Sequence, residues 1–465
     1  MTKAKTASPK RIKTDICVIG AGSGGLSVAA GAVQMGARVV LIEKGEMGGD
    51  CLNTGCVPSK ALLHAAQEGL SYPHAMEHVR KTISTIAPHD SQERFEGLGC
   101  TVIRAEARFT SPKSVEAGGI KIKARRFVIA TGSRPMLLDI PGLSTVPYLT
   151  NETIWGLTGC PRHLIILGGG PIGMEMAQAH RRLGAEVTVI EAFDALGRED
   201  PEAAELVKAT LRAEGVALRE GVAAERISGA AGAIQVTLSD GQVVQGSHLL
   251  AATGRRANSE ELGLEHADVD RSKNGIKVGA DLRTSNRRIY AIGDVVSGGL
   301  QFTHVAGYQA GIIVRSLLFA LPAKARTHHI PHATYTDPEL AQVGLTEAAA
   351  REKFAEKLEV VRADYTGNDR AIATGRGGAG FIKLMVVKGR PVGVTIVGPE
   401  AGELIAFWSL MLSLKLKMSK IAGMVAPYPT LAELNKRAVS AYFTPRLFEN
   451  RKVKWVVKAV QRLVP

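Results

Sequence analysis

Two cysteines five residues apart are the residues of this chain best suited to chemistry. Cys51 and Cys56 lie in the segment GGDCLNTGCVPSK, residues 48–60. On an ideal helix their α-carbons would be roughly 8–9 Å apart, whereas a disulfide spans about 4.4–6.8 Å. The backbone must therefore be distorted between them, which Gly55 permits. A helix that begins near this point would lower the pKa of a thiol and hold a reactive thiolate.

A metal site is the other common use of a close cysteine pair. Only five cysteines are present, and no further Cys or His cluster has zinc-site spacing, so we expect no metal. Cys17 lies in an apolar segment and is expected to be a small buried core residue. The three histidines that precede a predicted strand are interpreted as surface or interface residues; they are His328, His329 and His332.

A β-α-β pattern stands just before the cysteine pair. Its predicted elements are the strand 15–20, the small-residue helix 26–35 and the strand 38–42. Gly20, Gly22 and Gly25 match GxGxxG between strand and helix, where free N–H groups and the helix dipole bind a pyrophosphate. Glu43, at the end of the second strand, suits a contact with a ribose 2′-hydroxyl. The segment therefore predicts a dinucleotide site.

The same pattern returns downstream. Its predicted elements are the strand 163–167, the helix 174–183 and the strand 186–190. The glycines of this second turn are Gly168, Gly170 and Gly173. Glu191 repeats the acidic residue and favours NADH, because a carboxylate there would repel the 2′-phosphate of NADPH. Arg198 is close in sequence and would soften that preference. Two such units in one chain predict two dinucleotide sites.

Length and composition predict a basic, multidomain globular protein. The 465 residues exceed what one hydrophobic core serves, and the 45% hydrophobic content is ordinary for a globular chain. The net charge of +14 indicates a basic surface, with an anionic ligand, an acidic partner or an anionic membrane as alternatives. Aromatic residues are sparse and no zinc-finger or RNA-binding motif is present, which disfavours nucleic acid. Residues 1–13 lack the apolar core of a secretory signal, so we predict a cytoplasmic location.

The segment around the cysteines resembles the active-site segment of the pyridine nucleotide–disulfide oxidoreductases. The resemblance covers nearly the whole chain in the same order, and it favours the branch of dihydrolipoamide dehydrogenase and mercuric reductase. The other matching segments are ATGS at 130–133, AIGD at 291–294, HVAG at 304–307 and the stretch 336–347. Together these motifs are highly specific.

The resemblance implies a path for electrons from NADH through FAD to a Cys51–Cys56 disulfide. Cys56 would lie against the flavin as a thiolate, and Cys51 would exchange with substrate. The implied FAD-binding residues are Gly20, Gly22, Gly25, Glu43, Lys44, Gly132, Asp294 and His304. The implied NADH-binding residues are Gly168, Gly170, Gly173 and Glu191. Lys60 would stand near the flavin with Glu175 as its partner, and an ordinary ion pair is the alternative.

One position departs from the family pattern. Dihydrolipoamide dehydrogenase and glutathione reductase carry a His-Pro pair with a glutamate four residues after the proline. Here Tyr428 and Pro429 precede Glu433, so tyrosine stands in the place of the acid–base histidine. With a usual pKa of about 10, tyrosine is a poor base at neutral pH, though it can donate a hydrogen bond. Packing of Tyr428 at a dimer interface is the alternative.

Mercuric reductase also has a tyrosine near this place, but it needs a C-terminal cysteine pair to hand over the metal. No cysteine follows Cys160 in this chain.

The expected fold class is α/β, with two Rossmann-like dinucleotide-binding domains and a C-terminal α+β dimerisation domain with an antiparallel sheet. The expected segments are 1–150 and 276–330 for FAD, 151–275 for NAD(P)H, 331–450 for dimerisation and 451–465 for a basic tail. In this family the active site joins two subunits, so the resemblance implies a homodimer.

The C-terminal tail predicts a short basic amphipathic helix. Its apolar residues at helical spacing are Val453, Val456, Val457, Val460, Leu463 and Val464. Lys454, Lys458 and Arg462 follow another face, with Trp455 beside them. Such a helix lies on an anionic membrane, docks on a membrane-associated partner, or packs on the dimer.

The sequence thus predicts an FAD-dependent, NADH-linked oxidoreductase of a small or protein-bound disulfide or dithiol, similar to dihydrolipoamide dehydrogenase. The alternatives are metal reduction in the manner of mercuric reductase, or a flavin-dependent reduction of quinones or oxygen that bypasses the dithiol. The direction of electron flow depends on relative potentials.

Overall fold

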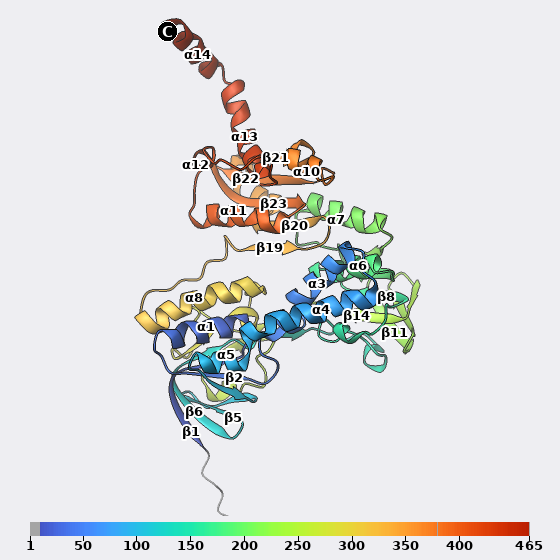
Figure 1. The fold of residues 1–465 in the computed structure, drawn as a ribbon, viewed down its shortest axis with the longest axis vertical. Coiled ribbons are helices and arrows are strands. Elements are labelled where there is room, and N and C mark those ends of the chain that lie inside the picture. Colours follow the sequence, from blue (N-terminus) through green and yellow to red (C-terminus); the bar gives the residue numbers. More distant parts are fainter. Residues whose placement is uncertain (1–9, 379, 465) are drawn as a thin grey trace, which may run out of the picture. The chain divides into compact units, whose positions relative to one another are not determined.

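The structure is a computed structural model that describes residues 10–378 and 380–464. The chain forms two compact units, whose elements are labelled in Figure 1. Unit 1 comprises the described residues up to Gly168, together with Arg182–Glu186 and Ala224–Arg326. Unit 2 comprises Gly169–Arg181, Val187–Ala223 and the described residues from Thr327 onward.

Unit 1 is built on a mostly parallel sheet in the order β3-β2-β1-β6-β5-β4, with β18 beside β6. The parallel strands are β1 (Arg11–Ile19), β2 (Val39–Glu43), β3 (Thr101–Arg104), β6 (Ile120–Ile129) and β18 (Ile289–Ala291). The antiparallel strands are β4 (Ala107–Ser111) and β5 (Ser114–Ala117). Helices α1 (Ser23–Gln34) and α8 (Thr303–Phe319) pack together, and their buried residues join the apolar side chains of β1 and β2 in one core.

The first strand begins earlier than expected, at Arg11 instead of residue 15. Residues 11–14 alternate polar and apolar side chains, so they lack the continuous apolar run of a buried strand. They are held because β1 pairs along its length with β6, from Arg11 opposite Lys121 to Ile19 opposite Ile129.

The redox segment of unit 1 lies on helices α2 (Gly49–Asn53) and α3 (Cys56–Gln67). Helices α4 (Tyr72–Ile86) and α5 (Gln92–Gly97) follow it in the chain. The smaller strands of the unit are β7 (Ser133–Pro135), β8 (His163–Leu167), β11 (Ala224–Ala230), β12 (Ala233–Leu238), β13 (Val243–Gly246), β14 (His248–Ala251), β15 (Arg255–Ala257), β16 (Arg271–Ser272) and β17 (Gly275–Ile276). Strand β8 has the predicted bounds and runs parallel to β14.

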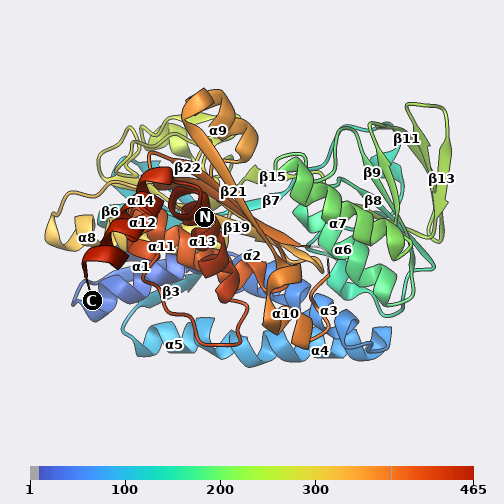
Figure 2. The same cartoon turned by 90° about the horizontal axis from the view of Figure 1, so that it is seen from above.

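Unit 2 contains a five-stranded antiparallel sheet in the order β19-β20-β23-β22-β21, which confirms the predicted antiparallel sheet. Its strands are β19 (Pro331–Thr334), β20 (Glu339–Gly344), β21 (Leu358–Asp364), β22 (Phe381–Val387) and β23 (Arg390–Gly398). Helices α11 (Ala401–Ser413) and α13 (Glu433–Phe448) pack against it (Figure 2). Trp408 and Asn435 join the two helices through a buried hydrogen bond of 2.8 Å.

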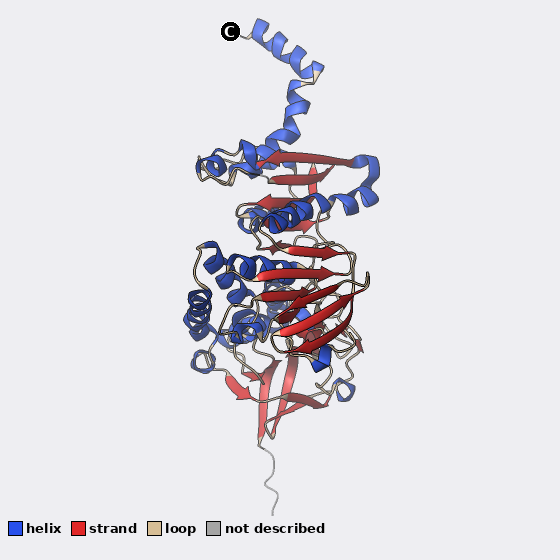
Figure 3. Cartoon of the chain, turned by 90° about the vertical axis from the view of Figure 1, so that its right-hand side faces the viewer, coloured by secondary structure: helices blue, strands red, loops and turns tan. Residues whose placement is uncertain are grey.

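Figure 3 distinguishes the helices and strands of the described chain by colour, including those not yet named. The latter are α6 (Pro171–Arg182), β9 (Glu186–Glu191), α7 (Pro201–Ala213), β10 (Ala217–Glu220), α9 (Glu347–Phe354), α10 (Asp369–Ala373), α12 (Met418–Ile421) and α14 (Arg451–Leu463).

The sequence pattern predicts two helices in this part of the chain, over 401–420 and over 429–441. The first is broken, because Lys415 has a left-handed φ of 52° just after α11 ends. The second, α13, begins at Glu433 instead of residue 429, beyond the prolines at 427 and 429.

Candidate active site

A cavity of about 690 Å³ in unit 1 brings most of the predicted FAD-binding residues together. Its lining includes Gly20, Gly22, Glu43, Lys44, Gly132 and Asp294, and it also includes Cys51. The volume lies within the range of roughly 300–1,000 Å³ that is typical of cofactor sites. Gly25 and His304 are not among the lining residues, whereas Thr303 and Ala306 are. A single cavity therefore extends from Glu43 at the end of β2 to Cys51, and Cys56 is not among its lining residues.

The glycine turn has no room for a side chain at Gly20 or Gly25. A Cβ on Gly20, whose φ is +102°, would stand 2.3 Å from the carbonyl oxygen of Ala130. A Cβ on Gly25 would stand 1.8 Å from the carbonyl oxygen of Gly20, so Gly25 acts in strand–helix packing and not in the cavity wall. Helix α1 begins directly after Gly22, and its first N–H groups are available to an anion.

Glu43 is fixed by two backbone N–H groups. Ala21 donates to its Oε2 atom at 2.6 Å, and Gly45 donates to its Oε1 atom at 2.7 Å. The carboxylate is thus held in one orientation in the cavity wall by two charge-assisted hydrogen bonds. The glycine turn, the helix N-terminus and this acid fit the pyrophosphate and ribose of a flavin dinucleotide.

Glu191 repeats this arrangement at the second turn. Gly169 donates to its Oε2 atom at 2.7 Å, and Phe193 donates to its Oε1 atom at 3.1 Å. Both acids therefore accept one N–H from the residue after the first glycine and one from the residue two positions beyond themselves. The duplication read in the sequence extends to hydrogen-bond geometry.

The glycines of the second turn occupy equivalent positions. Gly168 ends β8 with a φ of +106°, and a Cβ there would stand 2.5 Å from the carbonyl oxygen of Ala252. Gly170 precedes α6 and has no neighbour within 4 Å of a Cβ, while Gly173 is buried in the helix. The assignment of this turn to the phosphates of a second dinucleotide stays a prediction.

The helix break that the cysteine spacing predicts is present. Helix α2 ends at Asn53, and α3 begins at Cys56 with Gly55 as its N-cap. A Cβ on Gly55 would stand 3.0 Å from the carbonyl oxygen of Asp50, so the chain turns tightly at this point. Cys56 is the first residue of a twelve-residue helix, where the dipole stabilises a thiolate.

The two sulfur atoms lie in different environments. Cys51 is half-buried and Cys56 is exposed, and both are thiols in this structure. A hydrogen bond with Cys56 raises the pKa of Cys51, burial adds to the rise, and a hydrogen bond with Thr303 opposes it. The Oγ1 atom of Thr303 also lies 3.5 Å from the Cys56 sulfur. Thr303 is the first residue of α8, so a second helix N-terminus faces the dithiol.

Asp50 anchors the break between α2 and α3. Its Oδ1 atom accepts from Thr54 at 2.8 Å and from Asn151 at 3.0 Å, and its Oδ2 atom pairs with Arg255 at 3.0 Å. Trp155 donates from Nε1 to the carbonyl oxygen of Thr54 at 3.0 Å. The residue next to Cys51 is therefore fixed by three side chains from elsewhere in unit 1.

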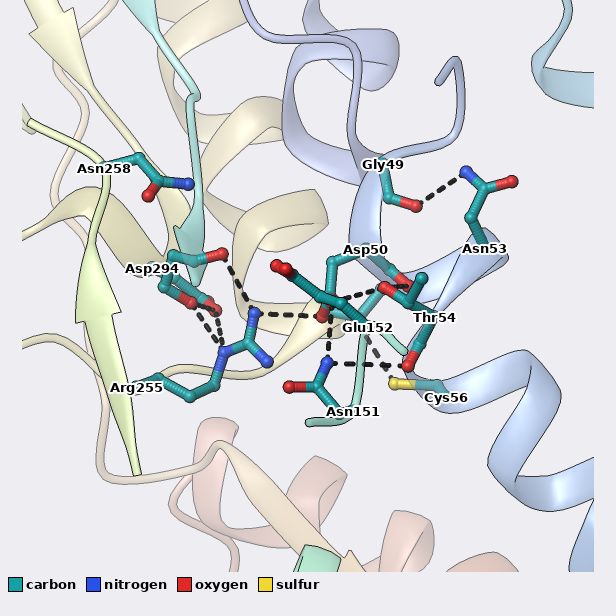
Figure 4. Close-up of polar contacts among 12 residues, drawn as sticks. Gly49, Asp50, Asn53, Thr54, Cys56, Asn151, Glu152, Arg255, Asn258 and Asp294 are labelled. Carbon is teal, nitrogen blue, oxygen red and sulfur yellow. Dashed lines mark hydrogen bonds and ion pairs between the residues drawn. The ribbon is translucent and has the colours of Figure 1, made fainter. Parts of the chain in front are cut away.

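Arg255 joins this anchor to the predicted flavin site (Figure 4). Its Nε atom donates to the Ser133 hydroxyl at 2.7 Å, and the hydroxyl donates to Asp294 at 2.7 Å. Burial raises the pKa of Asp294, while Ser133 and the positive charge of Arg255 act in the opposite direction. The guanidinium lies between the carboxylates of Asp50 and Asp294.

One feature of the sequence points toward Arg255. Residues 126–135 and 249–258 resemble each other, and in the structure their ends pair as β7 and β15, with Ser133 opposite Ala257. The resemblance marks a structural pairing, although it does not identify which arginine enters the cavity.

Lys60 and Glu175 belong to different units, so their pairing stays a prediction. Lys60 lies one turn after Cys56 on α3. Glu175 is buried in α6, where its Oε1 atom accepts from the backbone N–H of Tyr335 at 2.9 Å.

Tyr428 and Glu433 lie at the start of α13 in unit 2. The Tyr428 side chain is exposed, and its hydroxyl donates to Asp369 Oδ2 at 3.0 Å, which raises the pKa of the tyrosine. The peptide bond between Tyr428 and Pro429 is cis. The Oε2 atom of Glu433 is buried without a hydrogen-bond partner among the described residues. The hydrogen bond to Asp369 favours the protonated hydroxyl of Tyr428, and the role of Tyr428 in catalysis stays a prediction.

The other chemistry-bearing residues lie outside the cavity. Cys17 is fully buried, as predicted, and burial raises its pKa. His332 is half-buried, and its Nε2 atom lies 2.9 Å from Glu199 Oε2. Among the described residues, no three His, Cys, Asp or Glu side chains are grouped to hold a metal ion, and no helix is long and apolar enough to cross a membrane.

Two duplicated dinucleotide turns and a cavity that ends at a dithiol define a flavin- and nicotinamide-linked dithiol oxidoreductase. Residues 14–310 match the family model of the pyridine nucleotide-disulphide oxidoreductases, and residues 330–439 match the model of their dimerisation domain. The chain belongs to this family. It is an FAD-dependent, NAD(P)H-linked disulfide oxidoreductase with an α/β fold, as the sequence predicted, and its dimerisation domain supports a homodimer.

Over most of its length, the chain is similar in sequence to mercuric reductases and to dihydrolipoyl dehydrogenases. It is 35% identical over 453 residues to a mercuric reductase of Lysinibacillus sphaericus, covering 92% of this chain and 82% of the relative. It is 34% identical over 456 residues to a dihydrolipoyl dehydrogenase of Thermus scotoductus, covering 90% and 95%. A Cu(II) complex of RclA, an HOCl-induced flavoprotein disulfide reductase from Escherichia coli, superposes with a TM-score of 0.86 at 29% identity, covering 92% and 99%.

Proposed function

We propose that the chain uses NADH to reduce a disulfide carried on a small, largely uncharged group, of the lipoyl type. The observation that carries this proposal is that Cys51 lines two cavities. One is the predicted flavin cavity, and the other has a volume of about 430 Å³. Ser23, Gly48 and Thr303 also line both. The dithiol thus has a cofactor-sized space on one side and a substrate-sized space on the other.

The lining of the second cavity supports an apolar substrate. Its apolar side chains are Leu26, Ala30, Leu52, Val57, Ile86 and Phe95. Asp90 and Arg94 are its charged residues, and burial raises the pKa of Asp90. Apart from Asp90 and Arg94, the lining offers no charged partner to a highly charged peptide disulfide, whereas a disulfide on a hydrocarbon arm would be desolvated at little cost.

The proposed chemistry is thiol–disulfide exchange. The Cys51 thiolate attacks one sulfur of the substrate disulfide, and the first substrate thiol leaves with a proton. The Cys56 thiolate then attacks Cys51, which restores the protein disulfide and releases the second substrate thiol. FAD, when bound, supplies the transfer of electrons from the nicotinamide to that disulfide. Lys60 would hold positive charge near the flavin, and Tyr428 would act as a hydrogen-bond donor and not as a base.

The domain boundaries drawn from the sequence form part of the proposal. The matched dimerisation region, 330–439, supports the segment 331–450. We also infer a cytoplasmic homodimer, because a dithiol that must cycle between thiol and disulfide suits a reducing compartment.

An anaerobic titration of the purified protein with NADH tests the coupling of the dithiol to the flavin. A long-wavelength absorption band should appear after two electrons, because the Cys56 thiolate would then lie against the oxidised flavin. Bleaching of the flavin without that band would mean that the dithiol does not exchange electrons with it, and the disulfide proposal would fail.

Reduction of a metal ion is the second candidate function. Cys56 is exposed and lies beside Cys51, so a soft metal ion as substrate could be bound by both sulfur atoms. The mercuric reductase relatives and the Cu(II) complex of RclA favour this candidate. A panel of lipoamide, glutathione disulfide, Hg(II) and Cu(II), assayed by NADH oxidation, distinguishes the candidates. The first proposal requires that lipoamide have the largest kcat/KM.

Replacing Glu191 with alanine should remove the preference for NADH. The carboxylate is held by two N–H groups and cannot turn away from a 2′-phosphate. Losing one charge-assisted hydrogen bond costs about 1.5–3 kcal/mol, so kcat/KM for NADH should fall roughly 10- to 100-fold. The value for NADPH should stay constant or rise.

The matched control is Glu186→Ala at the exposed start of the same strand. It should leave the ratio of NADH to NADPH activity unchanged. An unaltered ratio in Glu191→Ala would refute the assignment of Glu191 to the ribose.

A further inference from the structure

Helix α14 is a basic amphipathic helix without a partner surface in the described chain. None of its residues is buried, and Leu463 is 82% exposed. The helix starts independently of α13, because the side chain of Asn450 accepts from the N–H groups of Lys452 and Val453 at 3.0 and 3.4 Å. A helix of thirteen residues is marginal in water by itself. An external surface would therefore stabilise it.

The two faces of α14 carry different chemistry. At 100° per residue, Val453, Val456, Val457 and Val460 fall within an arc of about 100°. The basic face lies opposite and consists of Arg451, Lys454, Lys458 and Arg462. Lys452 flanks the apolar arc, and no acidic residue follows Glu449. The helix thus combines five positive charges with one continuous apolar stripe.

We propose that α14 binds the enzyme to an anionic lipid surface. Clusters of four to eight Lys or Arg on an amphipathic helix match acidic headgroups, and the valine stripe would enter the boundary between headgroups and acyl chains. The long basic side chains reach the phosphates from the sides of the helix.

Two observations disfavour a second copy of this chain as the occupant. The matched dimerisation region ends at residue 439, before α14 begins. Two copies of a helix with five positive and no negative charges would also repel each other. Nucleic acid would neutralise the charge, but it would leave the valine stripe in water.

Flotation of the full chain with lipid vesicles tests the proposal. The chain should float with phosphatidylcholine vesicles that contain about 30% phosphatidylglycerol and not with pure phosphatidylcholine, and higher salt should reduce the binding. Each basic residue near the surface contributes about fivefold to binding, so Lys454→Glu/Lys458→Glu should weaken it by roughly 25-fold or more. Both lysines are exposed, and NADH oxidation by the double variant should be unchanged.

The matched control is Lys121→Glu/Lys123→Glu, which makes the same change in net charge on exposed positions of β6. It should bind like the unaltered chain, which would assign binding to α14 and not to overall charge. Equal flotation of the two double variants would overturn the proposal. Dissociation of a dimer in Lys454→Glu/Lys458→Glu, seen by sedimentation velocity without vesicles, would assign the helix to a second copy and would also overturn it.

Discussion

Replacing Cys51 with serine should abolish disulfide reduction and leave NADH-dependent reduction of a dye such as ferricyanide intact. Cys51 is the redox sulfur that lines the apolar cavity, and a serine hydroxyl can form no mixed disulfide there. Loss of a covalent nucleophile typically costs roughly 10⁴- to 10⁶-fold in turnover. Dye reduction needs only electron transfer from the nicotinamide to the flavin, and no bond to the Cys51 sulfur forms in that reaction, although Cys51 lines the flavin cavity.

The spectrum of Cys51→Ser should also change before any reductant is added. Cys56 would have no partner for a disulfide, and it stands at the first position of α3 and beside Thr303. A permanent thiolate should therefore give the long-wavelength band in the oxidised protein. Cys160→Ser, at a half-buried thiol elsewhere in unit 1, should change neither activity nor spectrum. Survival of lipoamide reduction in Cys51→Ser would instead favour a flavin reductase that bypasses the dithiol.

The parts of the site that could be predicted from sequence are those with short, local geometric requirements. Gly20 and Gly168 must be glycine because a Cβ would collide with a neighbouring strand. Glu43 and Glu191 are fixed by N–H groups of the turn that each strand adjoins. The break at Gly55 follows from the distance that two cysteines five residues apart must span. Each motif is contained within about 30 residues, so the pattern is visible in the chain itself, although the carbonyl groups that exclude a Cβ at Gly20 and Gly168 belong to Ala130 and Ala252.

The residues that sequence reasoning missed act through contacts between distant segments. Asp50 is next to Cys51, but its partners Asn151 and Arg255 are about 100 and 200 residues away. The sequence motif predicts His304 as the residue beside the flavin, whereas in the structure the neighbouring Thr303 contacts both thiols. Neither residue type nor spacing indicates which member of such a neighbouring pair enters the cavity. Only the register of α8 against the rest of unit 1 decides it.

Replacing Arg255 with methionine should weaken FAD retention and destabilise the redox segment. The guanidinium is 12% exposed and is the cation that faces both Asp50 and Asp294. Without the guanidinium, the carboxylates of Asp50 and Asp294 would share a part-buried site with no cation between them. Removing one partner of a buried ion pair costs several kcal/mol of stability. Because Asp50 is about one-third exposed, we expect a smaller cost of about 2 kcal/mol, or roughly 30-fold in the FAD dissociation constant. Flavin release during gel filtration and the thermal midpoint would measure both effects.

A double-variant cycle separates this electrostatic role from simple packing. Asp50→Asn removes one of the two carboxylate charges and preserves the hydrogen-bonding shape, so it should restore part of the FAD affinity lost in Arg255→Met. Arg255→Lys keeps the positive charge but cannot donate to Asp50 and Ser133 in the planar geometry of the guanidinium. Its affinity for FAD should therefore fall between that of the unaltered chain and that of Arg255→Met. If the effects of Arg255→Met and Asp50→Asn simply add, the two residues are not coupled. The segment before Cys51 would then be positioned by Asn151 and Thr54 alone, and flavin binding would be independent of the anchor beside the dithiol.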